Sequence, residues 1–69
     1  MYYAIEVPRN TSAHRIQEVA DDLNYLHIRT FDFKEDRDEW ISGCFTRMAL
    51  SSKDKRVQEL RRENKRRKH

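Results

Sequence analysis

The residue types with the clearest chemistry lie near the end of the chain, in residues 53–69. This segment holds nine basic and three acidic residues, a formal charge of +6. Lysine and arginine neutralise phosphates and release the counterions condensed on a nucleic acid, so such a cluster on one exposed element predicts sequence-independent binding to DNA or RNA. Five of the nine are arginines, whose planar guanidinium can bind a phosphate through two hydrogen bonds or stack on a base.

The rest of the chain has the opposite charge. Residues 1–52 hold six basic and nine acidic residues, a formal charge of −3, and the whole chain carries +3. An acidic body joined to a basic end of the same domain indicates a polyanionic partner or an acidic surface on another protein. We therefore expect a small nucleic-acid-binding accessory protein that contacts phosphates through its C-terminal helix. The expected contact residues are Lys55, Arg56, Arg61, Arg62, Lys65, Arg66, Arg67 and Lys68. The competing interpretation is a solvated helix whose charges keep a small protein soluble.

Aromatic side chains form a second candidate surface. Exposed aromatics on an open sheet face can stack on unpaired bases or contact another protein, although core packing is the competing interpretation in a chain this short of large apolar residues. The candidate protein-contact residues are Tyr2, Phe31, Phe33 and Trp40. The alternative function is thus a small protein-binding module or inhibitor that modulates a larger enzyme or complex, a format common among phage and mobile-element proteins. Self-association is compatible with the same surface.

No motif in the chain indicates catalysis, a metal or a cofactor. Cys44 is the one cysteine, and His14, His27 and His69 stand at no zinc-site spacing from it. The acidic run 35–39 lacks the glycine and the ligand spacing of a calcium loop. A single glycine in the chain excludes a glycine-rich phosphate loop. We therefore expect a protein that is not an enzyme and needs no cofactor.

Length and composition indicate one small soluble domain. A chain of 69 residues buries only about 60% of its unfolded surface, so its stability should be small. The lone cysteine fits a reducing compartment. No apolar run approaches the roughly 20 residues of a membrane span, and the first residues lack the pattern of a signal peptide. We expect a cytoplasmic protein without a membrane partner.

The periodicity of apolar residues predicts the elements that position these groups. Residues 2–7 alternate as a strand that Pro8 ends, residues 12–25 show the stripe of a helix, and residues 27–33 alternate again. A strand, a helix and a second strand can form a right-handed crossover with the two strands parallel. The charged run 34–39 is expected to be an exposed turn.

Residues 40–50 fit two interpretations. Their apolar stripe suits a helix, but a third strand pairing with residues 27–33 is favoured because two strands alone make a poor sheet. A last helix is expected to start at Ser51 and to dock on the body through Val57 and Leu60. The expected fold is a single small α+β domain in the order β-α-β-β-α with a three-stranded sheet. The alternative, with residues 40–50 helical, is β-α-β-α-α.

Overall fold

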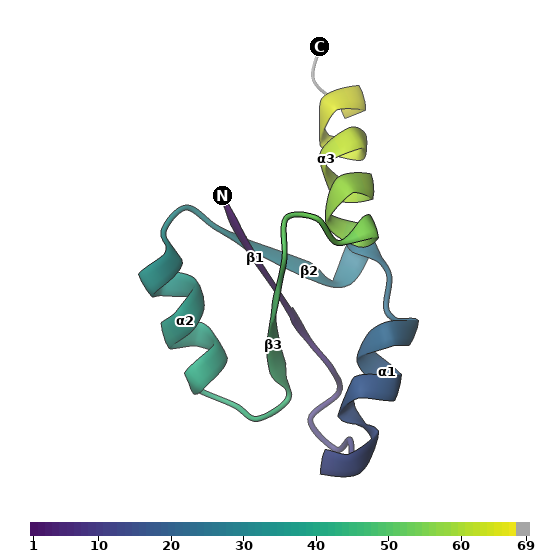
Figure 1. Ribbon diagram of the computed structural model, residues 1–69, viewed down its shortest axis with the longest axis vertical. Coiled ribbons are helices and arrows are strands. Elements are labelled where there is room, and N and C mark those ends of the chain that lie inside the picture. Colours follow the sequence, from purple (N-terminus) through teal and green to yellow (C-terminus); the bar gives the residue numbers. More distant parts are fainter. Residues whose placement is uncertain (68–69) are drawn as a thin grey trace.

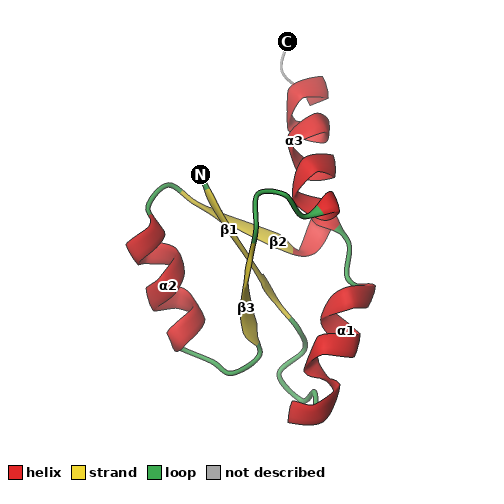
Figure 2. Ribbon diagram, viewed as in Figure 1, coloured by secondary structure: helices red, strands yellow, loops and turns green. Residues whose placement is uncertain are grey.

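A three-stranded antiparallel sheet lies at the centre of the chain, with helices around it (Figures 1 and 2). The computed structural model describes residues 1–67 and, of Arg67, the backbone alone. The elements are β1 Tyr2–Glu6, α1 Ile16–Asp22, β2 Ile28–Phe31, α2 Lys34–Ser42, β3 Arg47–Leu50 and α3 Lys55–Arg67, with 3₁₀ helices at Ala13–Arg15 and Tyr25–His27. The predicted small α+β domain with a three-stranded sheet is confirmed.

Strand β1 is the middle strand, and the core forms around it. The sheet order is β2-β1-β3, so both neighbours hydrogen-bond to β1. Its residues alternate between the two faces of the sheet, yet Tyr3, Ala4 and Ile5 are all buried, as is Val7 just beyond it. A strand buried on both faces must be covered by other elements on both faces.

The predicted parallel pairing of the first two strands is wrong. Strand β2 pairs antiparallel with β1, and Ile28 at its start lies opposite Ile5 near the end of β1. The physical reason is the length of the connection. Helix α1 has only seven residues, about 10 Å, and the extended backbone at Leu23 and Asn24 follows it. The connection therefore returns the chain to the end of the sheet where β1 finishes.

Helix α2 replaces the predicted charged turn at residues 34–39. Its first turn holds Glu35 and Asp36, whose charges complement the positive end of the helix dipole. Only Trp40 and Ile41 are apolar among its nine residues, so the sequence shows no periodic stripe. The predicted order β-α-β-β-α thus gains a helix between the second and third strands.

The ambiguous segment 40–50 divides at Gly43. Residues before it belong to α2, and β3 begins at Arg47. The strand interpretation is confirmed for the last four residues of the segment, but β3 pairs with β1 and not with β2. Gly43 sits at the C-cap of α2, so it does not destabilise a helix interior. The helix interpretation was right for the residues before Gly43, and the strand interpretation was right for those from Arg47 on.

Helices cover both faces of the sheet. Residues opposite each other in an antiparallel pair share a face, so Tyr2, Phe31 and Arg47 lie on the α2 side, where Trp40 packs against Phe31. Figure 2 shows α2 on one side of the strands and α1 on the other. The expected open sheet face is therefore absent from the described part of the chain.

Helix α3 docks on the opposite face, beside Tyr3. The Asp54 carboxylate accepts a hydrogen bond from the backbone N–H of Arg56 at 2.8 Å and caps the helix. Ser51, the predicted start, instead orders the preceding turn by accepting from Lys53 N at 3.1 Å. Val57 is fully buried and Leu60 half-buried, which confirms the predicted docking. Beyond these residues α3 projects from the sheet along the 41 Å long axis of the molecule (Figure 1).

Replacing Val57 with Ala should lower the free energy of unfolding by about 2 kcal/mol, because it leaves a cavity at a fully buried position. That is a large part of the roughly 3 to 5 kcal/mol available to a core of this size. Urea unfolding followed by Trp40 fluorescence measures the change. Leu26→Ala, at a position 70% exposed, is the control and should change it by less than about 0.5 kcal/mol. Equal effects of the two substitutions would contradict the docking of α3.

Candidate nucleic-acid interface

Five of the predicted phosphate-contacting residues lie exposed on α3. They are Lys55, Arg61, Arg62, Lys65 and Arg66, and we call them the α3 basic surface. At 100° per residue, Lys55, Arg62 and Arg66 lie opposite the buried Val57, whereas Arg61 and Lys65 border the docked side. The side chain of Arg67 and the whole of Lys68 lie outside the described residues.

Acidic neighbours neutralise little of this surface. Glu63 approaches Arg66 at 3.5 Å, an exposed pair of small energetic value. Within residues 1–66, whose side chains the structure describes, the other four members have no carboxylate oxygen within 4.0 Å. Their charge is therefore available to a partner.

Most of the exposed acids lie on other elements, although Glu59 is exposed on α3 itself. Helix α1 carries Glu18, Asp21 and Asp22, and α2 carries Glu35, Asp36, Asp38 and Glu39, all exposed. Both helices flank the sheet away from the projecting half of α3 (Figure 1). The cations of the α3 basic surface are thus separated in space from most of the exposed acids, and this separation favours the approach of a polyanion to α3.

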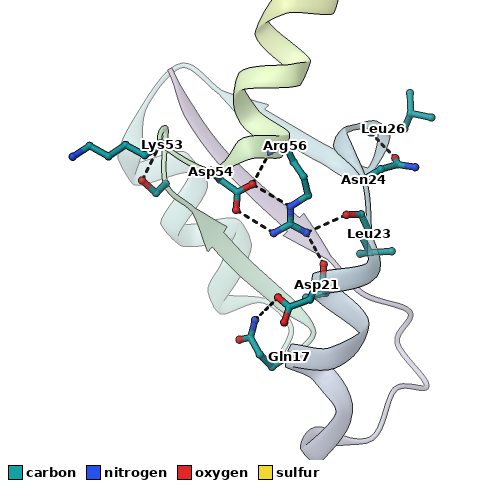
Figure 3. A network of polar contacts seen from close by, with 10 residues as sticks. Gln17, Asp21, Leu23, Asn24, Leu26, Lys53, Asp54 and Arg56 are labelled. Atoms are coloured by element: carbon teal, nitrogen blue, oxygen red, sulfur yellow. Dashed lines mark hydrogen bonds and ion pairs between the residues drawn. The ribbon is translucent and has the colours of Figure 1, made fainter.

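Arg56, another predicted contact residue, is engaged inside the protein (Figure 3). Its guanidinium binds both carboxylate oxygens of Asp54 at 3.1 Å and donates to the backbone oxygens of Ala20 and Leu23. Helix α1 has no basic residue in its own last turn, so Arg56 supplies the donors and the positive charge that its carbonyl end lacks. The side chain is 20% exposed and stands apart from the α3 basic surface.

The Arg56–Asp54 pair stays charged at neutral pH. The hydrogen bond from Arg56 lowers the pKa of Asp54 below its ordinary value, and burial opposes this effect. The same bond raises the pKa of Arg56. Sequence reasoning missed this role, although the position of Arg56 four residues before Leu60 places the two side chains on one helix face.

Arg47 has a comparable structural role on the α2 side. It donates to the Glu6 carboxylate at 2.9 Å and to the Trp40 carbonyl oxygen, at the end of α2, at 2.8 Å. The hydrogen bond from Arg47 lowers the pKa of Glu6. A Cβ atom at Gly43 would lie 2.9 Å from Arg47 Nη1, so the glycine leaves room for this contact.

Three of the four predicted protein-contact aromatics belong to the packing under α2. The Phe31 and Trp40 rings lie 5.7 Å apart, and the Arg37 guanidinium lies 5.4 Å from the centre of the Tyr2 ring. Tyr2 keeps 38% of its surface exposed, and Phe33, at 64%, is the most exposed of the four. Phe45, which was not among the predicted contact residues, is 63% exposed.

A groove opens between α3 and the start of β1. It has a volume of about 700 Å³ and is lined by Met1, Tyr3, Ser52, Leu60, Arg61, Asn64 and Lys65. Two members of the α3 basic surface thus stand at a cavity as well as at the outer surface. No sequence signal indicates this groove, because it depends on how α3 lies against β1.

The remaining reactive groups form no assembled site. The Cys44 thiol lies 3.0 Å from the Thr46 hydroxyl, and this hydrogen bond lowers the pKa of the thiol. Among the described residues, no three His, Cys, Asp or Glu side chains are placed to hold a metal ion. Nor does any described helix have the length and apolar character needed to cross a membrane.

Comparison with protein-family models, with curated proteins and with solved structures found no significant match to this chain. Its function is therefore inferred from its own geometry and charge.

Replacing Arg56 with Lys should lower the free energy of unfolding by about 1 to 3 kcal/mol. The charge is kept, but an ammonium group cannot reproduce the fork that binds Asp54 and the α1 carbonyls together. Urea unfolding followed by circular dichroism measures the loss. The matched control is Arg62→Lys, an exposed position on the same helix, with an expected change below about 0.5 kcal/mol. Equal stabilities of the two variants would show that the fork contributes nothing.

Acid should remove the contribution of Asp54. Because its folded-state pKa lies below the ordinary value of 3.8, its contribution is fully present above that value and is lost as the pH falls through the folded-state pKa. Thermal unfolding of the native protein and of Asp54→Asn should differ most near pH 7 and converge towards about pH 2. A difference that does not depend on pH would contradict the assigned ion pair.

Proposed function

We propose that this protein binds nucleic acid through the α3 basic surface. The observation that carries the proposal is the exposure of five cations on a helix that projects from the sheet, while seven exposed acids lie on α1 and α2 and Glu59 is the one exposed acid in the described part of α3. Cations held on a protruding helix can reach phosphates that a flat surface could not. The acidic body repels the same backbone, and this repulsion orients α3 towards it.

The attachment of α3 supports this role. Arg56 and Val57 fix the first turn against the body, so the projecting turns present their cations in a preformed geometry. An α-helix about 10 to 12 Å across fits the major groove of duplex DNA, and its cations can equally follow the backbone of a single strand. Phosphate contacts alone give affinity without a sequence code.

A second candidate function is binding to another protein, and the exposed apolar side chains favour it. Phe33 and Phe45, at 64% and 63% exposure, stand just before and just after α2. A partner protein would cover them together with the acidic surface of α2. Replacing both with Ser should abolish the capture of a stoichiometric partner from nuclease-treated extract. Capture that survives both substitutions would contradict this candidate.

Replacing Arg61, Arg62 and Lys65 with Ala should weaken binding to every oligonucleotide by on the order of tenfold to a hundredfold near 100 mM salt. The slope of log affinity against log salt should become shallower by about 2 to 3, since each lost phosphate contact removes about 0.9. Fluorescence anisotropy with labelled DNA and RNA, from about 50 to 200 mM salt, measures both quantities.

The matched control replaces Arg9, Arg15 and Lys34 with Ala. It also removes two arginines and one lysine from exposed positions, so both variants lower the formal net charge from +3 to 0. The control should retain most of the affinity and of the salt slope. Equal losses in the two variants would mean that net charge, and not α3, governs binding.

A further inference from the structure

The groove between α3 and the start of β1 combines apolar and polar groups. Met1, Tyr3 and Leu60 supply an apolar wall, and Ser52 and Asn64 supply polar groups. Its volume of about 700 Å³ falls within the range of small-molecule and cofactor sites, which are mostly apolar with a few convergent polar groups. The groove is therefore suited to a small, partly apolar group.

Tyr3 lines this groove, and its hydroxyl is open to solvent. Tyr3 is only 6% exposed, and its hydroxyl has no hydrogen-bond partner among the described residues. Every side-chain polar atom that is buried in the described part of the chain does have a partner, so the Tyr3 hydroxyl is not one of the buried atoms. The hydroxyl must then reach solvent, and Tyr3 lines the groove. The Asn64 amide, which lines the groove from α3, offers both a donor and an acceptor, as the edge of a nucleic-acid base requires.

Positive charge stands beside this wall. Arg61 and Lys65 line the groove, are exposed, and have no carboxylate partner within 4.0 Å in the described part of the chain. One ligand unit matches an apolar wall with hydrogen-bonding groups and two adjacent cations: a nucleotide, with its base on the wall and its phosphate between the cations.

We propose that this groove binds one unpaired nucleotide of a single-stranded nucleic acid. This inference rests on the proposed nucleic-acid binding, and it adds that the protein prefers a single strand to a duplex. The base packs against Leu60 and Met1 within reach of the Tyr3 hydroxyl and Asn64, and Arg61 and Lys65 bind its phosphate. A paired base cannot enter without leaving its stack, so a duplex contacts only the phosphate-binding cations.

Two double variants of the full chain test the proposal. Arg61→Ala with Lys65→Ala changes the groove, and Lys55→Ala with Arg62→Ala changes the outer side of α3. Each removes one arginine and one lysine from exposed positions. Anisotropy at one salt concentration compares a labelled single strand of about 12 nucleotides with its duplex and with an abasic strand of equal length.

The groove variant should lose about tenfold more single-strand affinity than the outer variant, while the two lose duplex affinity equally. The native protein should bind the abasic strand about tenfold more weakly than the normal strand, and Tyr3→Phe, which removes only the hydroxyl, should reduce this difference. Equal single-strand losses, or equal affinity for the abasic strand, would overturn the groove proposal and leave phosphate binding by α3 intact. No binding to any oligonucleotide would overturn both.

Discussion

The guanidinium of Arg56 is the contact on which the arrangement of this small domain most depends. It joins the start of α3 to the carbonyl end of α1 through Asp54 and the backbone oxygens of Ala20 and Leu23. Few large side chains are fully buried, so apolar burial alone supplies little stability. Arg47 makes the equivalent contact at the end of α2. Helices α1 and α2 have no basic residue in their own last turns. Each receives an arginine from another element, α1 from Arg56 and α2 from Arg47, which follows Trp40 by seven residues.

Five arginines of the second half of the chain form two groups in this arrangement. Arg47 and Arg56 are half-buried and stabilise helix ends, whereas Arg61, Arg62 and Arg66 are exposed on the projecting turns of α3. The first group holds the second in place, because Arg56 sets the direction in which α3 leaves the body. The helices that carry most of the exposed acids are those whose ends the first group stabilises. Stability and the proposed binding surface are therefore linked through α3.

The spacing of apolar residues along the sequence predicted β1 and the docked side of α3, which such spacing alone can indicate. The alternation in residues 2–7 identified β1, and Val57 and Leu60 identified the docked side of α3. Helix α2 escaped prediction because two apolar residues, Trp40 and Ile41, give no period; packing against the sheet holds it. The strand pairing and the groove depend on contacts between distant segments, which no periodicity encodes. The exposed cations of α3 were predictable from the charge of the segment. That Arg56 is not one of them follows only from the side of the helix on which it lies and from its hydrogen bonds to Asp54, Ala20 and Leu23.

Titration of the ¹⁵N-labelled full chain with a short single-stranded oligonucleotide, followed by amide chemical shifts, tests the central claim most directly. Binding by α3 predicts shifts concentrated in residues 58–66, with further shifts at Tyr3 and Ser52 if a base enters the groove, and little change in α1 and α2. Absence of shifts at saturating oligonucleotide, or shifts centred on α2 and Phe45, would contradict the assignment of α3 as the nucleic-acid-binding element.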